Sequence, residues 1–211
     1  MKTKIIILTG KAQSGKDTVC SFISSYLADR DISAGTYSFA TSLKKMCVDI
    51  LGLDYKQCWG SNEQKDTLTK FRWSSLPLTQ EEIEVLVRKN NKNINSLMTA
   101  RDVMQVFGTN IFRRFYPDCW VQSTINRIKK DGLDFAIISD ARFPNEINLL
   151  GLYSPLVIRL KRNVLANIHE SETALDNYVF GSTGEYYEID NCVLSIKETN
   201  TRIGAILGEY V

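Results

Sequence analysis

The 211-residue sequence is poor in the side chains from which many metal centres and nucleophilic sites are built. It contains one histidine, His169, with no cysteine nearby, which disfavours a histidine-based metal site. The five cysteines are scattered and form no C-x-x-C pair, so a zinc site and a disulfide framework are both disfavoured and reduced thiols are expected. No G-x-S-x-G occurs, and the sequence therefore lacks the nucleophile elbow of a serine hydrolase.

Long apolar runs and an excess of charge of one sign are also missing. The apolar run at residues 5–8 ends too soon for a signal sequence, and no segment reaches the length of a membrane span. The 26 basic and 24 acidic residues give a net charge of +2, so nothing global favours nucleic acid or a membrane as partner. A hydrophobic content of 44% can bury one full core, and we expect a single cytoplasmic domain over residues 1–211.

The residues that follow the first apolar run have the pattern of a phosphate-binding loop. Loop glycines allow successive backbone N–H groups to point at phosphate oxygens, while a lysine and a helix N-terminus add positive charge. A nucleoside triphosphate is the expected ligand. The loop residues are Gly10, Lys11, Ala12, Gln13, Ser14, Gly15, Lys16, Asp17 and Thr18.

The match to G-x-x-x-x-G-K-[ST] is one residue short. Asp17 occupies the position of the usual hydroxyl ligand of Mg²⁺, so either Thr18 takes over as the metal ligand or Asp17 has another role. A glycine-rich turn between a strand and a helix, with no bound phosphate, is the structural alternative.

The apolar pattern along the chain predicts strands that alternate with helices. This order is typical of an α/β fold, here a P-loop NTPase with a parallel five-stranded sheet flanked by helices and the glycine loop on a central strand. Residues 55–77 lose all periodicity, and residues 96–115 and 120–128 are predicted to be helical. We therefore expect a core at about 1–52 and 133–211, a helical insertion at about 53–132 and a short lid at about 159–172.

Charged residues follow two of the predicted strands at the edge where ligands bind. Asp140 comes after the buried run at 135–138 and could hold Mg²⁺, with a helix-capping role as the alternative. Arg142 could capture a phosphate in a bidentate manner, or form an ion pair with Glu146. Arg159 and Arg162 could bring positive charge over a transferring group from the lid, or belong to a solvated basic face.

Several short motifs occur in a fixed order along the chain. Besides the loop at Gly10 to Thr18 they are Phe39-Ala40 with Leu43-Lys44, Arg101-x-x-x-Gln105-x-x-Gly108-Thr109, Trp120-Val121, Asp140-x-Arg142 with Glu146, and His169-x-Ser171-Glu172. In this order the sequence resembles the deoxynucleoside monophosphate kinases of tailed bacteriophages. The resemblance runs from about residue 3 to residue 193 and is weakest between about 53 and 95.

The resemblance implies that ATP, with Mg²⁺, donates its γ-phosphoryl group to a deoxynucleoside monophosphate (dNMP), giving ADP and a dNDP in a cytoplasm, that of the host if the protein is viral. It implies catalytic roles for Lys16, Asp17, Arg142 and Arg162, and magnesium ligands at Thr18 and Asp140. The implied dNMP-binding residues are Ser14, Asp17, Lys44, Arg101, Gln105, Gly108, Thr109, Trp120, Asp140, Arg142 and Glu146. A homodimer is left open.

The absence of a catalytic histidine or cysteine agrees with this chemistry, because the attacking oxygen of a phosphate monoester is already ionised at neutral pH. One alternative is a kinase of the same fold that acts on another small phosphorylated acceptor, such as a phosphomevalonate or a coenzyme precursor. The other is a non-catalytic nucleotide-binding module, which would need a guanine-reading N-K-x-D. The nearest segment, Asn91-Lys92-Asn93-Ile94, lacks the aspartate.

Overall fold

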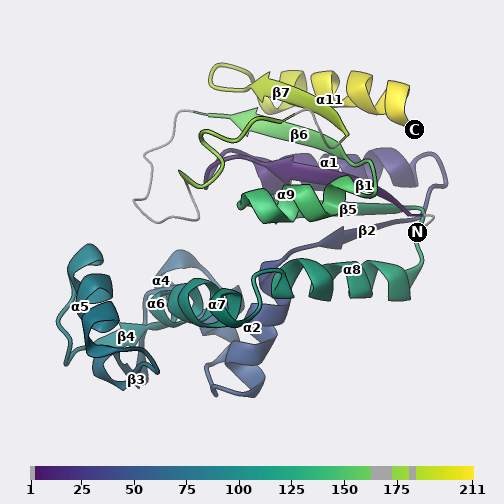
Figure 1. Cartoon of the computed structure of the whole chain (residues 1–211). Coiled ribbons are helices and arrows are strands. Elements are labelled where there is room, and N and C mark those ends of the chain that lie inside the picture. The colour runs from purple at the N-terminus through teal and green to yellow at the C-terminus, as the bar shows by residue number, and fades with distance from the viewer. Residues whose placement is uncertain (1–2, 163–172, 181–183) are drawn as a thin grey trace. The chain divides into compact units, whose positions relative to one another are not determined.

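The computed structural model describes residues 3–162, 173–180 and 184–211, and these divide into two compact units (Figure 1). The first unit comprises Met1–Ala40 and Trp120–Val211, and the second comprises Thr41–Cys119. The second unit therefore begins and ends about a dozen residues earlier than the insertion expected at 53–132. The difference arises because the helix after residue 40 packs into the core of the second unit, whereas the helix after residue 119 belongs to the first.

The first unit is built on a five-stranded sheet with the order β2-β5-β1-β6-β7, in which every pairing is parallel. The central strand β1 is completely buried from Ile5 to Leu8 because helices cover both faces of the sheet. The predicted fold class and the central position of the strand before the glycine loop are confirmed. The strands are β1 (Lys4–Thr9), β2 (Ala34–Tyr37), β5 (Phe135–Ala141), β6 (Leu156–Lys161) and β7 (Glu185–Asp190).

Two layers of helices enclose this sheet. Helices α1 (Lys16–Ala28) and α11 (Ile196–Tyr210) bury Ile23 and Ile203 in one cluster with Ile6 of β1. Alternate residues of a strand point to opposite faces, so Ile5 and Ile7 face the other layer. In Figure 1, α9 (Pro144–Gly151) lies in front of the strands and α1 behind them. A further helix of this unit is α8 (Cys119–Asp131).

The second unit has its own core around Trp73, which is 1% exposed. The helical prediction for 96–115 is wrong at its start, because residues 97–99 form a strand that pairs antiparallel with β3. A three-residue strand is too short to produce a periodic signal. The elements are α2 (Ala40–Asp49), α3 (Tyr55–Trp59), α4 (Asn62–Lys65), β3 (Leu68–Arg72), η1 (Trp73–Ser75), α5 (Gln80–Lys89), β4 (Leu97–Thr99), α6 (Ala100–Gln105), the π-helix η2 (Val106–Phe112) and α7 (Arg113–Phe115).

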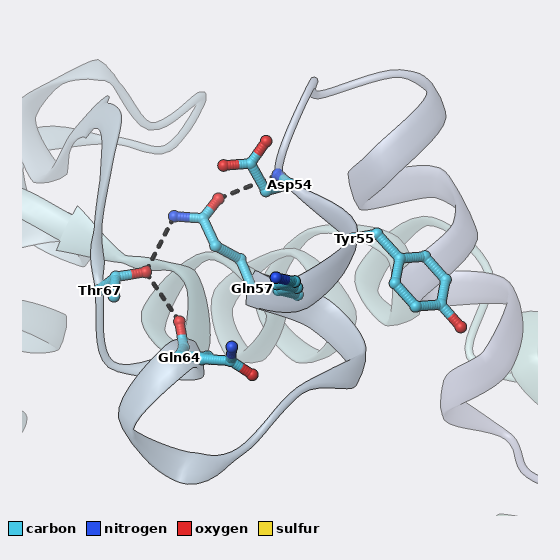
Figure 2. A pocket seen from close by; sticks show the side chains of 6 residues that line it. Asp54, Tyr55, Gln57, Gln64 and Thr67 are labelled. Atoms are coloured by element: carbon cyan, nitrogen blue, oxygen red, sulfur yellow. Dashed lines mark hydrogen bonds between the residues drawn. The ribbon is translucent and has the colours of Figure 1, made fainter.

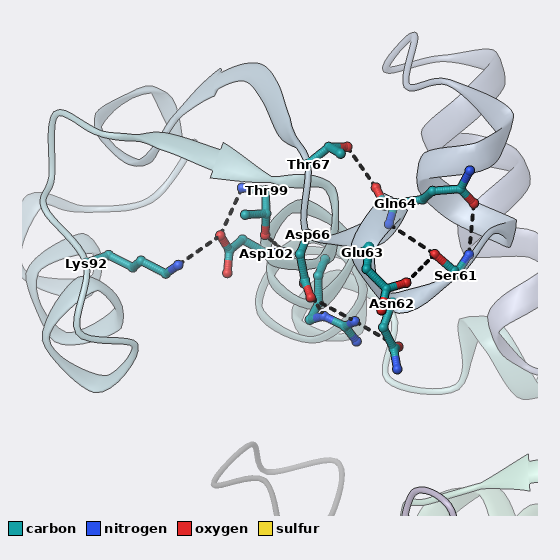
Figure 3. A network of polar contacts seen from close by, with 10 residues as sticks. Ser61, Asn62, Glu63, Gln64, Asp66, Thr67, Lys92, Thr99 and Asp102 are labelled. Carbon is teal, nitrogen blue, oxygen red and sulfur yellow. Dashed lines mark hydrogen bonds and ion pairs between the residues drawn. The ribbon is translucent and has the colours of Figure 1, made fainter.

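Capping boxes define where the short helices of the second unit begin. In each box the first side chain and the side chain three residues later satisfy backbone N–H groups that the helix leaves unpaired. Figure 3 shows the Ser61–Gln64 box of α4 and the contact between Thr99 and Asp102 at the start of α6. The boxes pair Asp54 with Gln57, Ser61 with Gln64, Thr79 with Glu82, and Thr99 with Asp102.

An open pocket of about 550 Å³ lies beside the start of α3 (Figure 2). The Gln57 amide crosses it, accepting from the Asp54 N–H at 3.0 Å and donating to Thr67 Oγ1 at 3.0 Å. These bonds hold the helix start against the segment that leads into β3. None of the helices within the described ranges combines the length and apolar character that crossing a bilayer requires.

Candidate active site

The glycine loop leaves β1 and enters α1 through a backbone that only small or specially placed residues can adopt. Gly10, Gln13 and Gly15 have φ angles of +138°, +61° and +96°. A Cβ atom on Gly10 would lie 2.5 Å from the Leu160 carbonyl oxygen, so the loop passes close against β6. Successive turns of this kind direct neighbouring N–H groups into one concave space, which is the geometry of an anion-binding nest.

Lys16, the first residue of α1, turns back into the loop and is 8% exposed. Its Nζ donates to the carbonyl oxygens of Gly10 at 2.7 Å and Lys11 at 2.6 Å. Burial and the nearby Arg142 lower the pKa of Lys16 to about 8, although Asp17 and Asp140 act to raise it. The loop thus encloses a cation whose charge is poorly solvated.

Asp17 and Thr18 occupy the first turn of α1 and are both exposed. Their oxygens are the hard donors that Mg²⁺ prefers, and Mg²⁺ usually takes only one or two protein ligands beside phosphates and waters. Within the part of the chain that the structure describes, no group of three or more His, Cys, Asp and Glu residues could hold a metal by itself. The oxygens of Asp17 and Thr18 fit a metal that takes its other ligands from phosphates and waters.

Asp140 caps a helix, but not the one that follows it in sequence. Its carboxylate accepts from Ser38 Oγ at 2.5 Å, from the Phe39 N–H at 2.8 Å and from the Ala40 N–H at 3.1 Å, which fixes the start of α2. An ionised carboxylate offers about four acceptor positions, so about one remains after these three bonds. Asp140 can combine the capping role with a contact to a metal or to metal-bound water.

Glu146 is 2% exposed and holds the segment that carries Arg142. Its Oε2 accepts from the Arg142 N–H at 2.6 Å and from the Phe143 N–H at 3.0 Å, two backbone groups that precede α9. The contact with Arg142 thus involves the Arg142 backbone N–H. This burial favours an indirect role for Glu146, which was expected to bind the dNMP, because its carboxylate fixes the position from which Arg142 extends.

The expected dNMP-binding residues of the second unit gather on α6, η2 and the adjoining α2. Arg101 donates from Nε to Asp66 Oδ1 at 2.7 Å and from Nη2 to Asn62 Oδ1 at 3.1 Å. The two acceptor residues, Asp66 and Asn62, are labelled in Figure 3. The structure brings Gln105, Gly108 and Thr109 onto the same helical segment as Arg101. The π-helix is rare, and π-helical turns within longer helices are frequently found at functional sites.

Two further residues with an expected dNMP-binding role lie on α2 and α8. On α2, the Nζ of Lys44 lies 4.6 Å from the centre of the Trp59 ring, within the range of a cation–π contact. The neighbouring Leu43 packs closely on η2, since a Cβ atom on Gly108 would lie 2.6 Å from its Cδ2. Trp120 lies in the first unit, on α8, and is buried.

Most of the predicted lid, including His169, lies outside the described residues. Arg159 ends up half-buried on β6, 3.8 Å from Asp176, and Arg162 is exposed after the strand. Asp176 also lies 3.6 Å from Lys11 of the glycine loop. These pairs join the segment after residue 172 to the phosphate loop.

Asn191 is a site residue that sequence reasoning missed. It follows β7 directly, is 5% exposed, and donates from Nδ2 to the Ser14 carbonyl oxygen at 2.9 Å. Its place after a parallel strand, at the same edge as Asp140, is the signal that could have identified it.

A loop of the phosphate-binding type on the central strand, with Asp140 and Arg142 at the same edge of a parallel sheet, is an arrangement suited to a phosphotransferase. Among proteins of known description, the chain is 30% identical over 175 residues to "Putative deoxynucleotide monophosphate kinase" of Acanthamoeba polyphaga mimivirus, and the alignment covers 81% of each chain. The chain belongs to the kinase family of that protein. A link to bacteriophages in particular stays a prediction.

Among solved structures, the chain is similar to an unliganded sugar kinase from Janibacter sp. HTCC2649. The sequence identity is 13% and the TM-score 0.47, with 98% of this chain and 95% of that chain covered. No protein-family model matches the sequence.

Proposed function

We propose that the protein transfers the γ-phosphoryl group of ATP to a deoxynucleoside 5′-monophosphate. An acceptor phosphate oxygen forms a bond to the γ-phosphorus while the bond from that phosphorus to the β–γ bridging oxygen breaks, which yields ADP and a dNDP. The observation that carries the proposal is the loop at residues 10–18, in which Lys16 is buried. The chain is also related to a protein described as "Putative deoxynucleotide monophosphate kinase".

The loop supplies the donor site in this proposal. Backbone N–H groups hold the phosphates, and Lys16 exchanges its bonds to the Gly10 and Lys11 carbonyls for phosphate oxygens. Asp17, Thr18 and Asp140 offer oxygen ligands to Mg²⁺, which when bound neutralises charge on the phosphates.

Positive charge and polar groups bind the acceptor. Arg142 and Arg162 stabilise charge on the transferring group, and Ser14 lines the space between the two phosphates. Arg101 binds the acceptor phosphate with its guanidinium group, which Asp66 and Asn62 hold in place. Because the nucleophile is already ionised, no general base is needed. The other residues proposed to contact the dNMP are Lys44, Gln105, Gly108, Thr109, Trp120 and, indirectly, Glu146.

A coupled assay of ADP release tests class and substrate together. The purified protein is given ATP, Mg²⁺ and each of the four deoxynucleotides and their ribose counterparts, with phosphomevalonate and a phosphorylated coenzyme precursor in parallel. We expect turnover with one or more deoxynucleotides. Turnover only with the other acceptors would replace the proposed substrate, and ADP release that no acceptor stimulates would favour a binding module.

Two variants examine the site itself. Lys16→Met and Arg142→Ala should each lower kcat by about a hundredfold or more, because each removes charge that faces the transferring group. Lys129→Met, on an exposed position of α8, serves as the matched control. Rates near wild type for Lys16→Met, in a folded protein, would contradict the proposed donor site.

A further inference from the structure

The peptide bond between Ser14 and Gly15 leads from the phosphate loop into α1. Gly15 has a φ of +96° and caps the N-terminus of α1, a position where glycine meets little steric restraint. A planar trans peptide directs its C=O and the following N–H in opposite directions. Whatever fixes the Ser14 carbonyl therefore also fixes where the Gly15 N–H points.

Asn191 provides this restraint from the far end of the chain. Its Nδ2 donates to the Ser14 carbonyl oxygen at 2.9 Å, and both residues are buried. The contact draws that carbonyl toward β7, away from the interior of the loop. By the geometry of the peptide, the Gly15 N–H is then directed to the opposite side, into the space that phosphate oxygens would fill.

Asn191 is itself held in place. Its backbone N–H donates to the Lys161 carbonyl oxygen at 2.9 Å, which continues the parallel pairing of β6 and β7 by one residue. The Nδ2 atom also lies 3.6 Å from the position that a Cβ atom would take on Gly15, so the amide lies directly beside this glycine. The sheet thus fixes the Asn191 backbone, and the Asn191 side chain holds the Ser14 carbonyl of the loop.

The orientation of the amide is informative. Asn191 Oδ1 is buried and has no hydrogen-bond partner among the described residues, while Nδ2 faces the only strong acceptor that the structure records for it. A buried unpaired oxygen is costly, and a leucine, which has the same number of side-chain heavy atoms and no polar group, would avoid that cost. An asparagine at this position is explained if its side-chain N–H group is needed to hold the loop.

We propose that Asn191 is a positioning residue of the phosphate loop, which holds the Ser14–Gly15 peptide with its N–H directed at the bound polyphosphate. The inference rests on the proposed function to the extent that the loop binds the phosphates of ATP. It predicts that loss of the Asn191 donor weakens the hold on phosphates specifically, whatever the acceptor.

Two nearly isosteric variants remove the donor in different ways. Asn191→Asp places an acceptor against the Ser14 carbonyl, and Asn191→Leu removes the donor without adding charge. Asp190→Asn, the same exchange in reverse at the exposed neighbouring residue, is the matched control. Calorimetric titrations with Mg·ATP and with Mg·tripolyphosphate, which has no nucleoside, give the affinities, and initial rates give kcat and each KM.

We expect both Asn191 variants to bind ATP and tripolyphosphate about tenfold or more weakly than wild type, the effect of losing a hydrogen bond at a buried group. The acceptor KM should change less than about twofold, and Asp190→Asn should match wild type in every measurement. If Asn191→Asp does not fold, Asn191→Leu and the smaller Asn191→Ser carry the same expectation.

Two results would overturn the inference. Affinities within about twofold of wild type in folded variants would show that the loop does not need the restraint. A loss confined to ATP, with tripolyphosphate binding unchanged, would mean that Asn191 contacts the nucleoside instead. A wild-type protein that binds neither ligand would refute the proposed function itself, which is a separate outcome.

Discussion

Lys16 should make ATP binding depend on pH in the alkaline range. Burial lowers the pKa of this lysine from 10.5 to about 8 in the empty protein. A bound triphosphate faces the ammonium group with several negative charges and raises the pKa again. Binding above about pH 8 must therefore take up a proton, and affinity must fall as the pH rises.

The size of the effect follows from the fraction of protein that carries the charged lysine. Between about pH 7.5, where the ATP phosphates are ionised, and about pH 9, this fraction falls about eightfold for a pKa of about 8. The dissociation constant for Mg·ATP should rise by the same factor. Calorimetry in two buffers of different ionisation enthalpy should show uptake of nearly one proton at about pH 9.

Lys16→Arg is the control, because a guanidinium stays charged throughout this range. The variant should show no proton uptake and a flat affinity. An affinity of the wild-type protein that is equally flat from about pH 7.5 to about pH 9 would refute the pKa argument, and with it the picture of a desolvated ammonium inside the loop.

The same lysine should affect the stability of the empty protein in the opposite sense. Its pKa is lower in the folded state than in the unfolded state, so the unfolded chain binds more protons between about pH 8 and about pH 10.5. The free energy of unfolding should gain about 3 kcal/mol over this window relative to Lys16→Met. Urea denaturation at several pH values measures the difference, and parallel curves for the two proteins would contradict it.

Two further variants test residues that act through others. Asp66→Ala removes the carboxylate that orients Arg101. Because the pair is partly exposed, we expect only a roughly two- to fivefold rise in the KM for the dNMP, with kcat unchanged. Initial rates at saturating ATP measure the KM, and an unchanged KM would argue against the role of Arg101. Glu146→Ala leaves the Arg142 and Phe143 N–H groups without their partner and should lower the free energy of unfolding by about 1–2 kcal/mol. Urea denaturation measures this decrease in stability, and a variant as stable as wild type would show that the two Glu146 hydrogen bonds contribute little.

The sheet of the first unit could be predicted because its strands are buried on both faces. Residues 5–8 and 135–138 are continuous apolar runs for that reason, and such runs are visible in a sequence. The second unit gave no comparable signal. Its α3 and α4 span five and four residues, too few for a helical period, and capping contacts rather than an apolar stripe define where they begin.

Some residues of the candidate site could likewise be predicted from the sequence, and others could not. The glycine loop is local, with its glycines and its lysine inside nine residues, so a motif can describe it. The role of the Asp140 carboxylate is more difficult to predict, because an aspartate at the end of a strand can either bind a metal or cap a helix. The helix that it caps starts 100 residues earlier in the sequence. Asn191 is a single residue that donates to a carbonyl 177 positions away, and no local pattern reports such a contact.

The topology explains why the support for the loop comes from the other end of the chain. In the order β2-β5-β1-β6-β7, β6 is next to β1 and β7 is next to β6 (Figure 1). All five strands are parallel, so their carboxyl ends lie at one edge, and the residue after β7 can reach the turn after β1. In the proposed arrangement, the direction of the Gly15 N–H therefore depends on the last two strands of the sequence, β6 and β7. It follows that the nine-residue motif in an isolated peptide would lack the restraint that Asn191 supplies, and that phosphate binding by the loop requires β6 and β7 to be in place.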